Sequence, residues 1–366
     1  MADNIKSIQI FGSIYSNHEI DSLCEEKIND VNVDSWEKDI YFFIRNWFSK
    51  SDRISVKTSG STGPPKLIEL QKKHMITSAK ATLKFFGLVP NNTAWLCIPI
   101  TYIAGKMVVV RSIVGGLNLI YSEPNANPSI VVNNKIDFAA MVPNQVFGLM
   151  ESNDSVDVLS HINHLLIGGS LLSKVIENRL LNYNNFNAWH SYAMTETITH
   201  IALRKIGHNS YMGDFYPLDG VKVNQDKENK LVINYPAIGV SDLVTNDIVK
   251  LFSDGSFTIL GRSDNIVVSG GVKLFPELIE SVIGESIKKE FFIGGIYDDK
   301  LGEKLVLFIE GDSYDINISD LQKIGKGVLN KYEMPKDIIF MKEFTRTQSG
   351  KIMRRESVEA YSRLSN

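Results

Sequence analysis

The loop at residues 58–66, TSGSTGPPK, joins the β-rich segments RISVKT (residues 53–58) and KLIEL (residues 66–70). Seven of its nine residues are Thr, Ser, Gly or Lys. Glycines let backbone N–H groups approach an anion, hydroxyls donate hydrogen bonds, and Lys66 supplies positive charge. The segment therefore predicts two short strands joined by a phosphate-binding loop.

The spacing of the loop differs from that of the best-known phosphate loop, in which G-x-x-x-x-G-K is followed by Ser or Thr. Gly60 and Gly63 are only three residues apart, and Leu67 stands where a hydroxyl would bind the metal. A flexible polar turn is the alternative interpretation, and the loop alone leaves both open.

Around this loop, apolar β-rich segments alternate with segments of helical spacing. Such alternation is typical of an α/β fold with a parallel or mixed sheet. Strands are expected at residues 93–100, 116–122, 136–142 and 164–170, helices at 34–50, 71–86 and 107–114, and a small antiparallel meander at 220–260.

The pattern changes again after GRSDNIVVSGG (residues 261–271), and the candidate domain boundary is Gly261–Asp264. Helices are expected at 276–285 and 319–331, and strands at 292–298, 304–310 and 337–344. About 100 residues of α+β pattern are enough for a small domain. We therefore expect a large N-terminal domain, residues 1–262, and a small α+β C-terminal domain, residues 263–366.

Composition and charge exclude several classes of protein. Of 366 residues, 43% are hydrophobic and 22% charged, and the net charge of -3 gives no basis for nucleic-acid binding. The apolar segment at 107–121 is broken by Arg111 and two glycines, so no membrane insertion is expected. Cys24 and Cys97 lack metal or redox spacing, and no signal-peptide pattern is found, which favours a cytoplasmic protein with free thiols. No pattern indicates the oligomeric state.

Two later segments carry residues suited to a nucleotide. Gly168 and Gly169 follow an apolar strand and allow close approach of a flat ring. In WHSYAMTET (residues 189–197), Tyr192 is suited to stack on a base, Thr195 to donate to a phosphate and Glu196 to ligate magnesium. Taken singly, each is more often structural, since such tyrosines usually lie in the core and glutamates in solvent.

Two more candidates come from the second half of the chain. Asp247, in LVTNDIVKLF (residues 243–252), is suited to accept hydrogen bonds from two ribose hydroxyls. Lys351 follows a glycine in TRTQSGKIMRRE (residues 345–356), where a solvated surface charge is the alternative.

Together and in this order, the segments resemble motifs of the adenylate-forming superfamily, which includes acyl-CoA ligases, luciferases and peptide-synthetase adenylation domains. TSGSTGPPK resembles its glycine-rich loop, SYAMTET its Tyr-Gly-x-Thr-Glu motif, and TND its Thr-Gly-Asp motif. GRSDNIVVSGGVKLFPELIE (residues 261–280) is similar to its hinge and thioester motif, and TRTQSGKIMRRE to its C-terminal lysine motif. The chain departs from the pattern at Ala193 and Asn246, which replace glycines.

The resemblance implies that the large domain binds ATP and an acyl substrate, and that a small mobile domain carries the catalytic lysine. A carboxylate would attack the α-phosphate of ATP, giving acyl-AMP and pyrophosphate, and a thiol, commonly that of coenzyme A, would then displace AMP. The implied catalytic residues are Lys351, Thr195 and Glu196, with Glu196 also binding Mg²⁺.

The resemblance also implies binding residues for the cofactors. Those for the pyrophosphate part of ATP are Thr58, Ser59, Gly60, Ser61, Thr62, Gly63 and Lys66; those for adenine are Gly168, Gly169, Ser170 and Tyr192; those for ribose are Asp247 and Arg262. Asp264 is the implied hinge, and Gly270 and Gly271 would let the pantetheine of coenzyme A pass close to the backbone.

One segment indicates which carboxylic acid the enzyme would use as its substrate. IPITYIAGKMVVVRSIVGG (residues 98–116) resembles a segment of o-succinylbenzoate–CoA ligases of menaquinone biosynthesis, with Pro99, Gly105 and Arg111 matching. Tyr102 stands in place of a histidine. A substrate with two carboxylates and a ring needs an apolar slot and a cationic anchor. The candidates for the acyl site are Arg111, Tyr102, Ala193 and His200, with Lys106 and Arg204 as further cations.

Three interpretations remain open. The first is an aryl-CoA ligase acting on o-succinylbenzoate. The second is a ligase for another aromatic or short-chain acid, or one that loads a carrier protein. The third is a non-catalytic adenylate-binding protein, against which the joint presence of Glu196, Asp247 and Lys351 argues.

Overall fold

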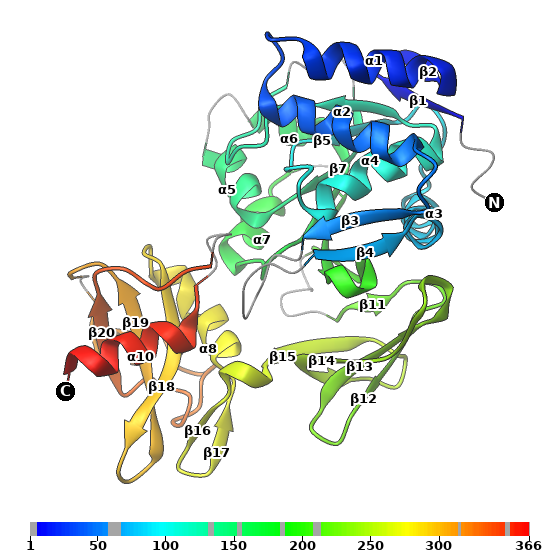
Figure 1. Ribbon diagram of the computed structural model, residues 1–366. Coiled ribbons are helices and arrows are strands. Elements are labelled where there is room, and N and C mark those ends of the chain that lie inside the picture. The colour runs from blue at the N-terminus through cyan, green and yellow to red at the C-terminus, as the bar shows by residue number, and fades with distance from the viewer. Residues whose placement is uncertain are drawn as a thin grey trace.

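The computed structural model describes residues 6–57, 67–130, 135–151, 156–183, 187–207, 214–313, 316–347 and 352–365. The predicted phosphate loop, residues 58–66, and Lys351 therefore lie outside the described residues. Within them, the strands form four sheets with helices packed around them (Figure 1).

The largest sheet has nine strands in the order β11-β10-β9-β8-β7-β5-β6-β1-β2. Neighbours from β1 to β9 pair in parallel, whereas β2, β10 and β11 pair antiparallel at the two edges. The strands are β1 (Ser7–Ile10), β2 (Ser13–Ser16), β5 (Thr93–Leu96), β6 (Asn118–Tyr121), β7 (Ile136–Met141), β8 (Ile162–Ile167), β9 (Asn187–Ala193), β10 (His200–Lys205) and β11 (Tyr216–Pro217). The accompanying helices are α1 (Asn17–Asn29), α2 (Ser35–Phe48), α3 (Lys72–Phe86), α4 (Ile103–Gly115), α5 (Pro143–Glu151), α6 (Val156–Ser160) and α7 (Lys174–Leu180).

The central strands are apolar on both faces because helices cover both sides of the sheet. Phe138 and Ala140 of β7 enter one hydrophobic core, whereas Ala139 and Met141 enter the other. Trp95 of β5 is fully buried in the second core. The continuous apolar runs of the sequence are thus two interleaved sets of core residues.

Three smaller sheets complete the fold. β3 (Arg53–Lys57) and β4 (Leu67–Gln71) form an antiparallel pair on either side of residues 58–66. The second sheet is the meander β12 (Lys222–Gln225), β13 (Lys230–Tyr235), β14 (Val240–Leu251) and β15 (Phe257–Arg262). The third contains β16 (Val267–Ser269), β17 (Val272–Leu274), β18 (Phe291–Asp298), β19 (Gly302–Glu310) and β20 (Asp337–Met341), with α8 (Pro276–Ile283), α9 (Ile318–Gly325) and α10 (Arg354–Ser365). It lies at lower left in Figure 1.

The predicted fold class, a mixed α/β fold with a large parallel sheet and a small meander, is confirmed. Several boundaries were wrong. The helix expected at 107–114 begins at Ile103, and the strands expected at 164–170 and 337–344 end at Ile167 and Met341. The strand expected at 93–100 ends at Leu96, since the chain turns before Pro99, whose nitrogen has no hydrogen to donate. The helix expected at 319–331 ends at Gly325.

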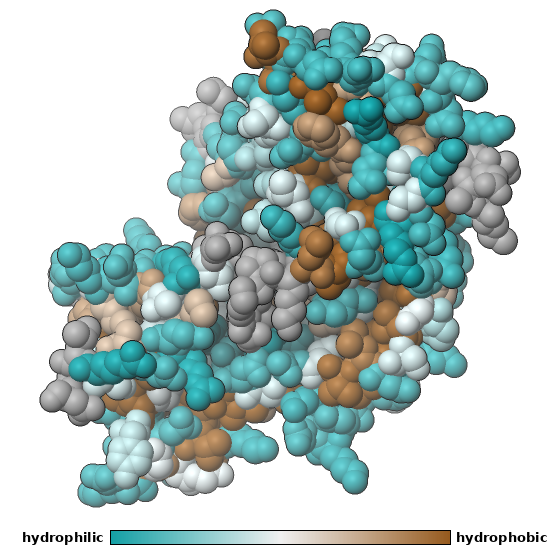
Figure 2. All heavy atoms as spheres, viewed as in Figure 1, coloured by the Kyte–Doolittle hydropathy of each residue, from teal (hydrophilic) through white to brown (hydrophobic). Residues whose placement is uncertain are grey.

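The surface seen in Figure 2 is mainly hydrophilic, with smaller apolar areas. In the described part of the chain, no helix has both the length and the apolarity needed to cross a bilayer. Cys24 and Cys97 are both buried free thiols, as the sequence predicts.

Candidate active site

Four parallel strands, β5, β7, β8 and β9, end at the same edge of the large sheet. In open α/β sheets, ligands bind in the crevice outside these carboxyl ends. Gly168 follows the last residue of β8, and Ala193 ends β9. Tyr102 follows β5 and precedes the first residue of α4, and its side chain is 41% exposed. The fold thus brings segments far apart in sequence to one edge.

Lack of space for a side chain explains the first glycine of the pair that follows β8. A Cβ on Gly168 would lie 2.3 Å from Oγ of Ser191, which is too close for any side chain to fit without a shift. Gly169 has φ +91°, a conformation that favours glycine. Gly169 and Ser170 are exposed. The backbone is therefore open to a flat ligand here, which is what an adenine pocket requires.

Tyr192, Asp247 and Arg262 meet, although they come from β9, β14 and β15. The Tyr192 hydroxyl donates to Asp247 Oδ2 at 2.5 Å, and Arg262 Nη1 lies 3.4 Å from Asp247 Oδ1. Asp247 and Arg262 are direct partners in the β14–β15 register. Thr245 Oγ1 accepts from the Asp247 amide at 3.1 Å. Asp247, the acidic residue predicted to bind the ribose, is thus held in place by three neighbouring side chains.

Burial sets the electrostatics of this group. Burial raises the pKa of the Asp247 carboxyl. The hydrogen bond from Tyr192 and the charge of Arg262 lower this pKa and so oppose part of the rise. Burial, followed by the charge of Asp247, raises the pKa of Tyr192 well above its usual value. The ring of Tyr192 packs edge-on against Phe257, with centroids 5.4 Å apart. Stacking of Tyr192 on a base stays a prediction, because its side chain is only 8% exposed.

Thr195 and Glu196 lie in the short 3₁₀ helix η1 (Thr195–Thr197) that follows β9. Glu196 is exposed, and Thr195 is half-buried. Magnesium usually keeps several waters and takes one or two carboxylates together with substrate phosphates. A single exposed glutamate fits this mode. Across the residues that the structure describes, no group of three or more His, Cys, Asp or Glu could hold a metal by itself.

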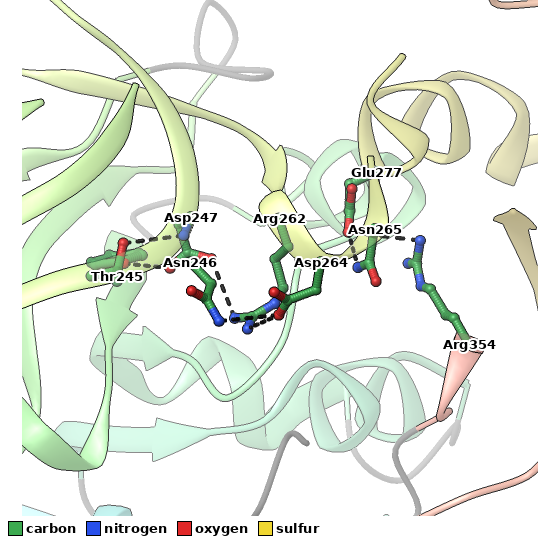
Figure 3. Close-up of polar contacts among 9 residues, drawn as sticks. Thr245, Asn246, Asp247, Arg262, Asp264, Asn265, Glu277 and Arg354 are labelled. Carbon is green, nitrogen blue, oxygen red and sulfur yellow. Dashed lines mark hydrogen bonds and ion pairs between the residues drawn. The ribbon is translucent and has the colours of Figure 1, made fainter. Parts of the chain in front are cut away.

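The ribose group continues into the segment joining β15 to β16. Arg262 Nη2 donates to Asp264 Oδ2 at 2.8 Å, and Asn246 Nδ2 donates to the same carboxylate at 3.2 Å (Figure 3). The predicted hinge residue is therefore exposed but tied, through Arg262, to Asp247.

A second polar group lies just beyond it. Asn265 Nδ2 donates to Glu277 Oε1 at 2.5 Å, and Arg354 Nη1 lies 3.7 Å from the same oxygen (Figure 3). Arg354 Nη2 donates to Glu280 Oε2 at 2.8 Å. Because Arg354 begins α10, three residues after Lys351, the start of this helix is fixed to α8.

Gly270 and Gly271 form the turn between β16 and β17. Their φ angles are +57° and +81°, and both residues are exposed. The Gly270 amide donates to the Leu301 carbonyl at 2.8 Å, which holds the turn against the β18–β19 hairpin. Because both residues have left-handed backbone, glycine is favoured at both positions.

Two of the residues predicted to line the acyl site, Arg111 and His200, are buried in the protein. Arg111 in α4 is 2% exposed, and His200 in β10 is 3% exposed. Thr82 of α3 lies between them: its Oγ1 accepts from Arg111 Nε at 3.1 Å and lies 3.3 Å from His200 Nε2. Burial lowers the pKa of Arg111 to about 9, and burial, then Arg111, lowers the pKa of His200 well below its usual value.

The other two cations have structural partners. Lys106 Nζ donates to the Ile100 carbonyl at 2.8 Å. Arg204 is paired with Glu177 in the core, which accounts for its charge without a substrate. Sequence reasoning missed Thr82, Glu177 and His190. Their partners lie 14 to 118 residues away along the chain, and no local pattern marks such contacts.

Comparison with known proteins shows which family the chain resembles in sequence and fold. Residues 56–235 match the family model "AMP-binding enzyme". A 2-succinylbenzoate–CoA ligase of Listeria monocytogenes is 29% identical over 348 residues, covering 87% of this chain and 72% of the relative. The crystal structure of an acyl-CoA synthetase (AMP-forming)/AMP-acid ligase II-like protein from Dyadobacter fermentans is 30% identical, with a TM-score of 0.61, covering 93% of this chain and 97% of the other. An o-succinylbenzoate coenzyme A synthetase of Bacillus subtilis, solved with ATP and magnesium ion, shares 18% identity and the fold, with a TM-score of 0.69 over 94% of this chain and 82% of the other.

The structure places the glycine pair at the carboxyl edge of the large sheet and brings Tyr192, Asp247 and Arg262 into direct contact. With near-complete coverage of a relative at 30% identity, the chain belongs to the AMP-binding family, among its AMP-forming acyl-CoA ligases.

Proposed function

We propose that the protein activates o-succinylbenzoate as its acyl-adenylate and then transfers the acyl group to coenzyme A. The observation that carries the first half is the contact of Tyr192, Asp247 and Arg262 beside the glycine pair, at the carboxyl edge of the sheet. The name of the Listeria relative supports the acid.

In the first half-reaction, a carboxylate oxygen forms a bond to the α-phosphorus of ATP, and the bond to pyrophosphate breaks. Two anions must approach each other, so charge neutralisation is the main task. We assign Lys351 and Thr195 to the α-phosphate and the acid, and Asp247 with Arg262 to the ribose. Residues 58–66 would hold the leaving pyrophosphate. Mg²⁺, bound through Glu196, would supply charge stabilisation on the phosphates.

In the second half-reaction, a thiolate sulfur attacks the acyl carbon, and AMP leaves. Lys351 would occupy space that the thiol must enter, so the two steps need different arrangements. We propose that residues 263–366 form a domain that rotates at Asp264 and brings Gly270 and Gly271 to the acyl-adenylate. The exposed position of Asp264 and of this glycine turn supports the proposal.

Arg111 supports a dicarboxylate as the acid. Its guanidinium is buried beside the Phe138 ring, 5.8 Å from the centroid. In the described part of the chain, no acidic side chain pairs with it. Burying an unpaired charge is costly. The second carboxylate of o-succinylbenzoate would supply the missing negative charge.

A competition assay tests the acid. The enzyme would be given Mg-ATP and coenzyme A with o-succinylbenzoate, benzoate, cinnamate or a short fatty acid, and AMP release would be measured. We expect kcat/KM to be highest for o-succinylbenzoate. Preference for a monocarboxylate would overturn the acid assignment and leave the adenylation assignment standing. A further assay with a carrier protein in place of coenzyme A distinguishes the two acceptors.

A further inference from the structure

A row of buried polar contacts lies behind the glycine loop, defined here as residues 168–170. Glu177 of α7 is paired with Arg204 of β10, and both side chains are 6% exposed. Arg204 Nη2 lies 3.3 Å from Nδ1 of His190 in β9. His190 Nε2 lies 3.1 Å from the carbonyl oxygen of Ser170. The row therefore leads from a buried carboxylate to the backbone of the loop.

Chemistry fixes the direction of each hydrogen bond. A guanidinium only donates, so Nδ1 of His190 accepts from Arg204; a carbonyl only accepts, so Nε2 carries the proton and donates to Ser170. Burial, followed by the charge of Arg204, lowers the pKa of His190 to about 4. The imidazole is therefore neutral at neutral pH, and Arg204 holds it in the tautomer that donates to the loop.

The same strand holds the loop at its other end. Ser191 Oγ donates to the Ile167 carbonyl at 3.1 Å, directly before Gly168. Two consecutive residues of β9 thus fix the backbone on either side of the glycine pair. Gly169 and Ser170 are exposed, and these two side-chain contacts tie the backbone at the two ends of the loop to β9.

Stability alone does not account for this arrangement. A buried ion pair is often no more stabilising than apolar residues of the same size. A pair that orients a histidine, which in turn holds a loop carbonyl, has a use that apolar residues cannot replace.

We propose that His190 is a positioning residue for the purine of ATP, because it holds the Ser170 carbonyl and so the shape of the loop that lines the adenine pocket. This inference rests on the proposed function, which assigns ATP to the loop. His190 does not contact the reacting atoms, and its effect passes through Ser170.

The test compares His190→Phe, which keeps a ring but has no hydrogen-bonding atom, with His190→Gln, which keeps a donor and an acceptor. Binding of a fluorescent ATP analogue is titrated without acid substrate, and KM for ATP and for the acid is measured separately. Loss of one neutral buried hydrogen bond predicts roughly three- to tenfold weaker nucleotide binding in His190→Phe. KM for the acid should stay within twofold, and His190→Gln should recover most of the affinity.

His164→Leu is the matched control, since this histidine lies in the adjacent strand β8, packed on Phe86 with centroids 5.3 Å apart. If His190→Phe is folded and binds the analogue as tightly as the wild type, the inference is wrong. Equal losses in His190→Phe and His164→Leu would also overturn it. Should His190→Phe not fold, the double variant Glu177→Gln/Arg204→Met removes the pair that sets the tautomer and must show the same loss. Tight binding without AMP release from any acid would instead count against the proposed function alone.

Discussion

Arg111 is the residue on which substrate choice depends most directly. It is enclosed by Thr82, His200 and Phe138, and its charge has no acidic partner among the described residues. Arg111→Met removes the charge while keeping an apolar chain of similar length, so the variant should fold. If Arg111 binds the second carboxylate, kcat/KM for o-succinylbenzoate should fall roughly ten- to a hundredfold.

The matched readout is benzoate, which has no second carboxylate, so its kcat/KM should change little in Arg111→Met. KM for ATP should also be unchanged. Equal losses for both acids would mean that Arg111 is structural and that the second carboxylate is bound elsewhere.

His190 also makes stability depend on pH. Its pKa is lowered to about 4 in the folded protein from an ordinary 6.5. The unfolded chain therefore binds more protons between these values, and the stabilising contribution, present above pH 6.5, is lost as the pH falls toward 4. The full effect is about 3 kcal/mol, as an upper limit.

The measurement is the free energy of unfolding of the wild type and His190→Gln at several pH values from 7 to 4. The wild type should lose more stability on acidification, and the two curves should converge as the pH falls. The exposed His18, changed to Gln, is the control and should follow the wild type. Parallel curves for His190→Gln and the wild type would contradict the buried, neutral imidazole.

Among the elements, the glycine loop and β9 are in close contact. A methyl group on Gly168 would meet Ser191 Oγ at 2.3 Å, whereas Ser191 Cβ lies at 3.7 Å, an ordinary contact. Gly168→Ala should therefore force the hydroxyl away from the Ile167 carbonyl and cost roughly 1–3 kcal/mol of unfolding free energy.

The double variant Gly168→Ala/Ser191→Ala removes the clashing atom. It should be more stable than Gly168→Ala alone, with a favourable coupling of at least about 0.5 kcal/mol in a urea-unfolding cycle. Simple additivity of the two single changes would show that the loop is looser than described.

The sequence predicts most elements because their signals are local. The helix expected at residues 34–50 is α2 (Ser35–Phe48), with its apolar face buried, and the short β-segments expected at 220–260 form the meander. Tyr192 and Asp247 were named from their residue types and Arg262 from the resemblance, and the three side chains do meet.

What the sequence did not predict depends on long-range contacts. The partnership of Arg204 with Glu177 and His190 needs the three-dimensional register of β9 and β10. The burial of Arg111 did have a signal: the segment around it is apolar on all sides, which indicates a helix covered all round. Reading that pattern would have placed Arg111 inside the protein from the start.

For the whole molecule, Asp264 is where we expect the two proposed domains to pivot. Proline fixes φ, so Asp264→Pro should restrict rotation there. The rate of one half-reaction should then fall on the order of a hundredfold, while the rate of the other stays within about tenfold of the wild type. This difference is expected because the two steps need different domain arrangements. Pyrophosphate release and thioester formation from supplied acyl-adenylate measure the two separately.

Asp264→Ala is the control, because it removes the contact with Arg262 but leaves the backbone free. It should affect both half-reactions mildly. If Asp264→Pro slows both half-reactions equally, or neither, rotation at this residue is not part of the cycle.

In the proposed reaction, the carboxylate attacks the α-phosphate of ATP. Phosphorus NMR of the wild-type reaction with o-succinylbenzoate, Mg-ATP and coenzyme A measures this directly. We expect AMP and pyrophosphate in equal amounts from the wild type. Lys351→Ala should form neither product but should still bind the nucleotide. Formation of ADP and inorganic phosphate by the wild type would contradict attack on the α-phosphate.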